Sequence, residues 1–167
     1  MKPKRRASPK RIAAGDWQTP ASLANLITSW LAHHGLQPSL VIEPTCGVGN
    51  FLAAARQQWP TSTGLGYERN AAYVKIAQER FADNESIDVR TANFFACDWP
   101  VIFQELTSPI LVLGNLPWVT NAELGSLEIE NTPVKSTPNN WRGWEALTGS
   151  ANFDISQAML MQPLMAL

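Results

Sequence analysis

The sequence of 167 residues contains only two cysteines, Cys46 and Cys97, and no long run of apolar side chains. The two cysteines suggest no disulfide framework and fit no metal-ligand spacing, so we expect two reduced thiols and no metal site. The longest apolar runs, such as residues 110–113, are far shorter than the roughly 20 residues needed to span a bilayer. The basic start of the chain is not followed by the apolar stretch of a signal peptide, which favours a cytoplasmic protein without membrane contact.

Positive charge is scarce outside the N-terminus. Residues 1–11 contain six basic side chains and no acidic one, whereas the rest of the chain contains seven basic and fourteen acidic side chains. A DNA-binding surface needs concentrated positive charge to neutralise phosphates, which residues 16–167 do not supply by themselves. Residues 1–15 are predicted to form a basic, flexible arm that is either a phosphate contact or a solvated tail.

The first predicted helix spans residues 21–33. Its apolar face repeats at helical spacing and consists of Leu23, Leu26, Ile27, Trp30 and Leu31. Thr19 or Ser22 is the expected N-cap, with Pro20 at the first helical position.

Strand and helix patterns alternate along the following residues. Short apolar runs predict strands over residues 39–43, 63–68, 87–90 and 110–114, although glycines weaken the second of these. Helical patterns fall at residues 51–58 and 71–81, and one or two helical turns within 97–108. This alternation predicts a mainly parallel sheet flanked by helices, with ligands bound at the carboxyl ends of the strands.

Two features follow predicted strands in the first half of the chain. A glycine-bearing stretch with Gly47 and Gly49 lies between a strand and a helix, where glycines let the backbone approach a ligand closely. Its alternative reading is a plain strand-to-helix turn, because the third glycine of the dinucleotide fingerprint is missing. Glu68 ends the next strand, 19 residues after Gly49, where a carboxylate accepts hydrogen bonds from ribose hydroxyls.

A third feature follows the strand at residues 110–114. Asn115 offers an amide oxygen, Leu116 offers a backbone carbonyl held by Pro117, and Trp118 offers a flat apolar face. Two acceptors beside a stacking surface suit an exocyclic amino group on a flat base. The alternative is a strand-ending turn with a core tryptophan.

These residues together resemble the adenine-specific DNA methyltransferases. Residues 43–52, EPTCGVGNFL, are similar to motif I, which is often D-P-x-C-G-x-G-x-F, and Glu68 matches the motif II acid. NLPW at residues 115–118 is similar to motif IV, usually N-P-P followed by an aromatic residue. WQTP at residues 17–20 resembles motif X, which precedes motif I in the gamma-type arrangement, and DIS at residues 154–156 resembles the start of motif V. The joint order and spacing of the motifs make the resemblance specific.

The resemblance implies a Rossmann-like class I methyltransferase fold with S-adenosyl-L-methionine as the cofactor. By position, the implied cofactor-binding residues are Thr19, Pro20, Glu43, Cys46, Gly47, Gly49, Asn50, Glu68, Asn93 and Phe94. The implied catalytic residues are Asn115, Leu116, Pro117 and Trp118. No metal is implied.

The implied reaction is transfer of a methyl group to the N6 amino group of adenine in DNA, within a restriction-modification or related system. Two acceptors on the amino hydrogens would stabilise positive charge as it develops on a poorly nucleophilic nitrogen. The implied partner is DNA with a flipped adenine, since a stacked base cannot reach such a pocket.

The sequence departs from the family pattern at two positions. Asn93 stands where the motif III Asp is usual, and Leu116 stands where motif IV usually has its first proline. The N-L-P pattern also resembles ribosomal RNA adenine dimethyltransferases. The alternatives are therefore methylation of RNA adenine or of a protein glutamine, or a non-catalytic cofactor-binding partner subunit.

The resemblance covers about residues 16–167 and stops after motif V. We therefore expect a partial catalytic domain whose sheet is incomplete and whose isolated chain associates and has little activity. A second chain or a missing C-terminal segment would then carry target recognition.

Overall fold

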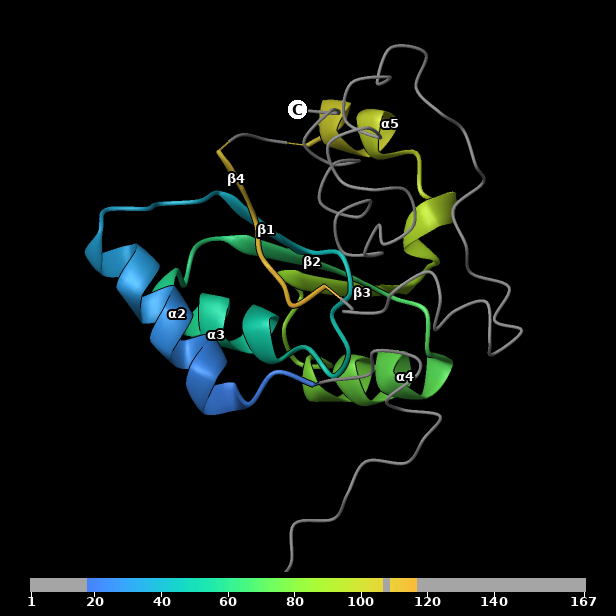
Figure 1. The fold of residues 1–167 in the computed structure, drawn as a ribbon, viewed down its shortest axis with the longest axis horizontal. Helices are drawn as coiled ribbons and strands as arrows, with labels where there is room; N and C mark the ends of the chain where they lie inside the picture. Colours follow the sequence, from blue (N-terminus) through green and yellow to red (C-terminus); the bar gives the residue numbers. More distant parts are fainter. Residues whose placement is uncertain (1–17, 107–108, 117–167) are drawn as a thin grey trace, which may run out of the picture. The chain divides into compact units, whose positions relative to one another are not determined.

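A computed structural model describes residues 18–106 and 109–116 (Figure 1). The predictions for the N-terminal arm, for Pro117 and Trp118 and for motif V lie outside these residues. The described elements, in chain order, are α2 (Ala21–His33), β1 (Leu40–Glu43), α3 (Asn50–Gln58), β2 (Thr63–Glu68), α4 (Ala71–Arg80), β3 (Ile87–Thr91), the 3-10 helix η1 (Phe94–Ala96), α5 (Trp99–Gln104) and β4 (Ile110–Val112). None of the helices in these ranges has the length and apolar character needed to cross a membrane.

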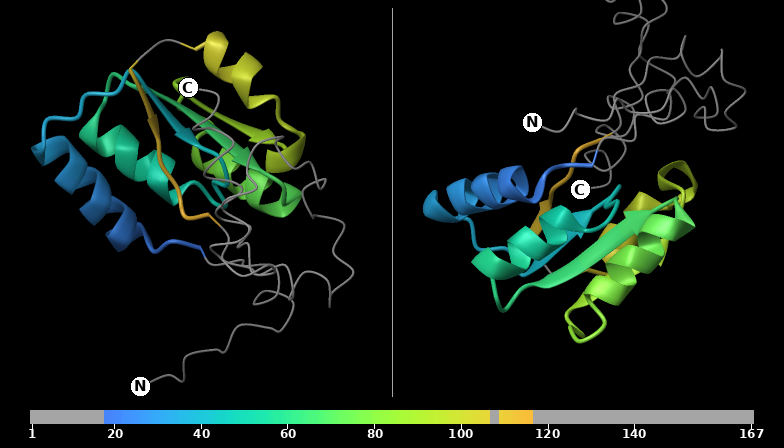
Figure 2. Two further views of the ribbon diagram at one scale, coloured as in Figure 1. Left: turned by 45° about the horizontal axis from the view of Figure 1, so that its top comes forward. Right: turned by 90° about the horizontal axis from the view of Figure 1, so that it is seen from below.

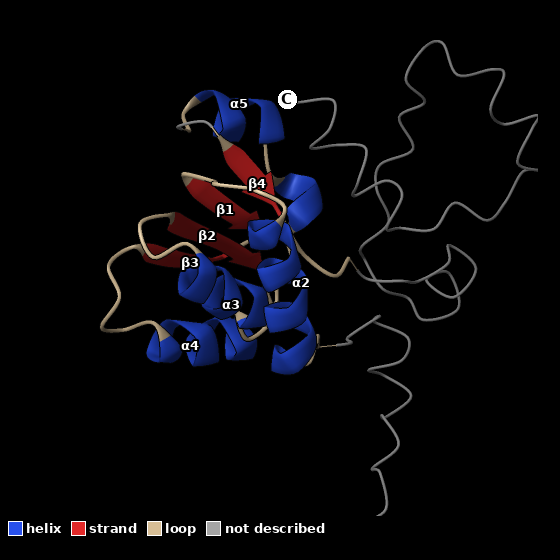
Figure 3. Ribbon diagram, turned by 90° about the vertical axis from the view of Figure 1, so that its left-hand side faces the viewer, coloured by secondary structure: helices blue, strands red, loops and turns tan. Residues whose placement is uncertain are grey.

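The four described strands form one sheet in the order β3-β2-β1-β4, and all three pairings are parallel. Leu40 of β1 is in register with Thr63 of β2 on one side and with Ile110 of β4 on the other. Helices α2, α3 and α4 cover one face of the sheet, and α5 covers the other (Figures 1 and 3). The prediction of a mainly parallel, Rossmann-like sheet flanked by helices is confirmed for the described residues.

The two glycines of β2, which weakened its prediction as a strand, are explained by how closely α3 packs on it. Alternate residues of a strand point to opposite faces of the sheet. A Cβ atom on Gly66 would lie 2.8 Å from Cδ1 of Leu52 in α3 and 2.9 Å from Sγ of Cys46. On the opposite face, the ring of Tyr67 meets that of Trp99 in α5 edge-on, with centroids 5.4 Å apart. The strand therefore needs a small residue on one face and a large one on the other.

Helix α2 has the predicted bounds, but the prediction of its buried face is wrong in part. Leu23, Leu26 and Trp30 are 45%, 66% and 58% exposed within the described part of the chain. The side chains that pack most closely are the small ones of Ala24 and Thr28, which are both fully buried. Ala24 joins Phe51 and Ala54 of α3 in one cluster, so the helix turns its small residues toward α3.

The prediction of the cap of α2 is also wrong. Pro20, expected at the first helical position, has ψ of 139° and is itself the N-cap residue, with no side-chain cap. Its carbonyl oxygen accepts from the backbone N–H of Leu23 at 3.0 Å and of Ala24 at 3.1 Å. The backbone carbonyl oxygen of Thr19 accepts a hydrogen bond from the side chain of Asn50 in α3.

Candidate functional site

The carboxyl ends of the strands meet at one edge of the sheet because all the pairings are parallel (Figure 2). The strand order reverses beside β1, since β2 and β3 follow on one side of it and β4 lies on the other. Crevices at such a reversal are the usual ligand sites of parallel sheets. Glu43, Glu68 and Asn115 all stand at or just beyond strand ends on this edge.

The loop between β1 and α3, residues 44–49, which we call the glycine loop, is held in a conformation that needs glycine. Gly47 and Gly49 have φ of +53° and +76°, a region that side chains with a Cβ rarely adopt. The N–H of Gly49 donates to the carbonyl oxygen of Cys46 at 2.8 Å, which closes the turn directly before α3. The prediction that the backbone turns tightly here, between a strand and a helix, is therefore confirmed.

The carboxylate of Glu68 closes the glycine loop from the neighbouring strand. Its Oε2 accepts from the backbone N–H of Gly47 at 2.8 Å, and its Oε1 accepts from the N–H of Asn70 at 2.7 Å. A carboxylate offers about four lone-pair positions, so these two bonds leave capacity for further donors. Glu68 thus connects the loop after β1 to the start of α4, at the position where the sequence predicted a ribose acceptor.

Glu43, at the end of β1, is 4% exposed. Burial raises the pKa of its carboxyl well above the usual range, against the lowering effect of a hydrogen bond from the N–H of Leu52 at 3.3 Å. A Cβ on Gly114 would lie 3.7 Å from Cγ of Glu43, so the segment after β4 passes beside this carboxyl group. Glu43 therefore lies between the glycine loop and the segment that carries Asn115.

Two residues that precede α2 contact the glycine loop and the first residue of α3. Oε1 of Gln18 accepts from the N–H of Val48 at 3.2 Å, and its amide lies so close to Gly47 that a Cβ there would overlap it. The carbonyl oxygen of Thr19 accepts from Nδ2 of Asn50 at 2.8 Å. The structure therefore joins the predicted motif X segment to the predicted motif I loop. Gln18 lies within the W-Q-T-P stretch but was not among the predicted site residues, because a glutamine carries no distinctive sequence signal of such a contact.

Two of the predicted cofactor-binding residues have side chains in the core. Cys46 is 3% exposed and packs with Leu52, while burial raises the pKa of its thiol. Phe94 is 4% exposed, with its ring 4.8 Å from that of Trp99. Both side chains therefore belong to the core of the described chain. Their direct contact with a ligand stays a prediction, and their burial does not favour it.

Three further predicted residues, Asn93, Asn115 and Leu116, lie at the same edge. Asn93 caps η1, with its Oδ1 accepting from the N–H of Phe95 at 3.2 Å. Asn115 and Leu116 follow β4 and are half-buried. Pro117 and Trp118, the other two predicted catalytic residues, lie outside the described residues.

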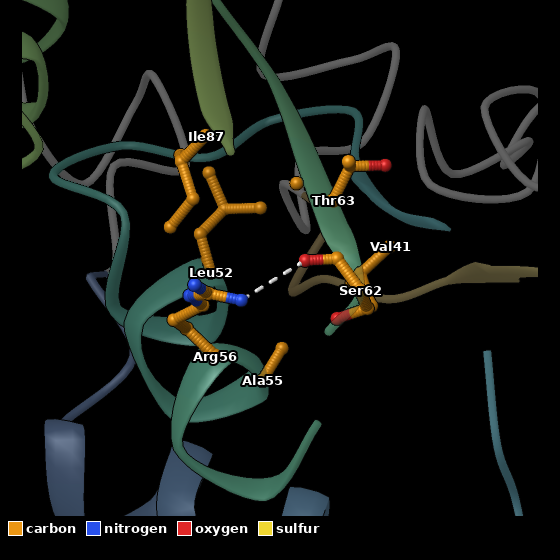
Figure 4. Close-up of a pocket in the computed structure, with 8 residues that line it drawn as sticks. Val41, Leu52, Ala55, Arg56, Ser62, Thr63 and Ile87 are labelled. Atoms are coloured by element: carbon orange, nitrogen blue, oxygen red, sulfur yellow. Dashed lines mark hydrogen bonds between the residues drawn. The ribbon is translucent and has the colours of Figure 1, made fainter. Parts of the chain in front are cut away.

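A separate hollow lies at the opposite end of the sheet, where β2 and β3 begin. It is lined by residues from β1, α3 and the starts of these strands: Val41, Leu52, Ala55, Arg56, Ser62, Thr63, Gly64 and Ile87 (Figure 4). Arg56 donates to the carbonyl oxygen of Ser62 across it at 3.4 Å. The hollow contains no predicted site residue, and no cluster of His, Cys, Asp and Glu within the described ranges could hold a metal ion.

Comparison with known proteins identifies relatives over most of the chain. No protein-family model matches it. It is 41% identical over 155 residues to the Type II methyltransferase M.NspV of Nostoc sp. (strain ATCC 29411 / PCC 7524), a match that covers 91% of this chain and 32% of that protein. It is 25% identical over 117 residues to the Type II methyltransferase M.CvrRI of Paramecium bursaria Chlorella virus XZ-6E, covering 70% of this chain and 28% of that protein. Among solved structures it is similar to the 23S rRNA methyltransferase ErmE, with 16% identity, a TM-score of 0.47 and coverage of 70% of this chain and 44% of that one.

The chain has the fold of a Rossmann-like α/β protein. Its parallel strand order reverses beside β1, and a carboxylate at the end of β2 accepts a hydrogen bond from the glycine loop. The identity to M.NspV across nearly the whole chain makes the protein a homologue of the type II methyltransferases. The chain spans about a third of the length of the two curated relatives that it matches.

Proposed function

We propose that this chain carries the S-adenosyl-L-methionine site and the amino-group acceptors of a DNA adenine methyltransferase. The observation that carries the proposal is the hydrogen bond of 2.8 Å from the N–H of Gly47 to Glu68, which sets a carboxylate and a glycine loop side by side at the order reversal of the sheet. The homology to type II methyltransferases supports the same conclusion. The remaining length of those relatives would contribute the rest of the activity.

The described residues fit this cofactor in two respects. The Oγ1 atom of Thr45, in the glycine loop, is buried without a hydrogen-bond partner among the described residues, as expected of a group placed near a ligand. Glu68 keeps lone pairs for the hydroxyl groups of a ribose after accepting from Gly47 and Asn70. In the proposal, Thr19 and Pro20 lie near the methionine part, and Asn93 accepts a hydrogen bond from the adenine part.

When bound, the cofactor supplies an electrophilic methyl group on a sulfonium centre. The residues of the chain then have a positioning and electrostatic task. The amide oxygen of Asn115 and the carbonyl oxygen of Leu116 would accept the two hydrogens of the adenine amino group. Two acceptors favour a more tetrahedral nitrogen and stabilise its developing positive charge. Trp118 would stack on the flipped base and keep it in place.

The test of the cofactor site is calorimetric titration of S-adenosyl-L-methionine into the purified chain. Glu68→Ala is expected to weaken binding by about tenfold or more, because it removes the ribose acceptor and one support of the glycine loop. Glu79→Ala is the matched control, since it removes an exposed carboxylate from the helix that follows Glu68 and its only described ion pair is with Lys75. Equal binding by the wild type and Glu68→Ala would contradict the assignment of Glu68.

The substrate is tested by methyl transfer from labelled cofactor with DNA, RNA and protein present together. The label is expected on N6 of adenine in DNA. Label on RNA adenine or on a protein glutamine would instead support one of the two alternative substrates.

A further inference from the structure

The side chain of Asn50 connects two segments that are far apart in the sequence. Its Nδ2 donates to the carbonyl oxygen of Thr19, and its Oδ1 accepts from Nη1 of Arg80, both at 2.8 Å. A primary amide donates only through nitrogen and accepts only through oxygen, while a guanidinium group only donates. Arg80 therefore fixes which end of the Asn50 amide faces Thr19.

The end of α4 also contacts the glycine loop directly. Nη1 of Arg80 donates to the carbonyl oxygen of Val48 at 3.2 Å, and the guanidinium carbon lies 5.6 Å from the centre of the Phe81 ring. Phe81 packs against Gly49, where an added Cβ would lie 2.6 Å from Cε2 of the ring. Arg80 and Phe81 together thus contact residues 48–50.

We propose that Arg80 is a positioning residue that holds the Thr19 segment and the glycine loop in a fixed mutual geometry, by orienting the amide of Asn50. Both segments contain residues predicted to bind the cofactor, so the consequence for binding rests on the function proposed above. Arg80 itself touches neither the cofactor nor the substrate in this proposal.

The chemistry of arginine suits this role. Nη1 donates to both Asn50 and Val48, and the guanidinium carbon lies over the Phe81 ring, 5.6 Å from its centroid. A lysine ammonium at position 80 can reach one or both acceptors but has neither the rigid donor geometry nor the flat surface. Because Arg80 is exposed, solvent weakens each of these bonds, and a moderate effect on affinity follows.

The first experiment measures binding of S-adenosyl-L-methionine to the full chain and to Arg80→Gln, Arg80→Lys and Asn50→Ala. Arg80→Gln is expected to weaken binding about tenfold, and Arg80→Lys is expected to restore part of the loss. The double variant Arg80→Gln/Asn50→Ala is expected to lose less affinity than the sum of the two single losses, because both changes break the bond between Arg80 and Asn50, while only Arg80→Gln also removes the bond to Val48. Lys75→Gln is the control, since it removes a cation of the same helix that pairs only with exposed Glu79 among the described residues.

The second experiment needs no ligand. Amide hydrogen exchange of the unliganded chain is expected to rise about tenfold at Val48 and Gly49 in Arg80→Gln, with the amides of β1 unchanged. A general loss of stability would instead raise exchange in β1 as well. The two readouts therefore separate a local positioning role from a merely structural one.

The outcomes separate the two proposals. If the wild type binds the cofactor and Arg80→Gln binds it equally well, the positioning role is overturned while the cofactor site stands. If the wild type does not bind, the proposed function fails, and the exchange experiment still decides about Arg80. Unchanged exchange at Val48 and Gly49 in Arg80→Gln would overturn the positioning role.

Discussion

The backbone N–H of Gly47 donates a hydrogen bond of 2.8 Å to Oε2 of Glu68, although Gly47 lies in the loop after β1 and Glu68 is the last residue of β2. The register of β1 with β2 brings them together, since Glu43 at the end of β1 is paired with Gly66, two residues before Glu68. One carboxylate therefore supports the glycine loop and also receives the N–H of Asn70 at the start of α4.

The first prediction concerns this dual acceptor. In Glu68→Gln one of the two acceptor oxygens becomes an NH2 group that faces a backbone N–H. The free energy of unfolding is expected to fall by about 1–3 kcal/mol, the usual cost of leaving such a donor unpaired. Urea unfolding of the unliganded chain is the measurement, with Glu79→Gln as the exposed control. Equal stability of Glu68→Gln and the control variant would contradict the role assigned to the carboxylate.

The second prediction is a pH dependence that comes from Glu43. Its pKa in the folded chain is raised well above its ordinary value of 4.5, mainly by burial, so the folded state holds this proton more tightly than the unfolded state. Stability therefore falls as the pH rises above about 4.5, until the folded pKa is reached. In Glu43→Gln this contribution disappears. The difference in unfolding free energy between the wild type and Glu43→Gln is expected to be smallest near pH 4 and to grow in favour of the variant toward pH 8. A difference that does not change with pH would show that Glu43 does not titrate in this way.

The third prediction uses two glycines with similar backbone angles. Gly35 and Gly49 have φ of +86° and +76°, but a Cβ at Gly35 meets nothing within 4 Å, whereas at Gly49 it meets Phe81 at 2.6 Å. Gly35→Ala is expected to cost about 1 kcal/mol from backbone strain alone, and Gly49→Ala about 2–4 kcal/mol because overpacking adds to the strain. Thermal unfolding measures both. Replacing Phe81 by Leu is expected to recover part of the loss in Gly49→Ala, and equal costs at the two glycines would refute the contact with Phe81.

The fourth prediction compares the two glycines of β2 that face α3. A Cβ on Gly66 would lie 2.8 Å from Leu52, while one on Gly64 would lie 3.2 Å from Ile87, a distance that small shifts can relieve. Gly66→Ala is expected to lower stability by about 1–3 kcal/mol, and Gly64→Ala by clearly less. Chemical unfolding of the two variants tests the order. A larger loss at Gly64 would mean that α3 does not pack on β2 as described.

Much of this architecture was predictable from local patterns in the sequence. The bounds of α2 and β2 agree with the apolar periodicity, and the glycine loop lies where a Gly-x-Gly sequence separates a strand from a helix. These features depend on neighbours within a few residues, which the sequence displays directly. The site residues at strand ends follow from the same patterns, because parallel strands bring their carboxyl ends to one edge.

Only the tertiary structure decided which faces are buried and which distant residues meet. The apolar stripe of α2 predicted burial of Leu26 and Trp30, but close packing on α3 selected the small side chains of Ala24 and Thr28 instead. Arg80 shows no sequence signal of a role at the glycine loop, 32 residues from Val48, because a hydrogen bond at that separation depends on how α4 folds back along the sheet. The sequence by itself thus determined the elements and the chemistry available at their ends, while packing determined the partners of each side chain.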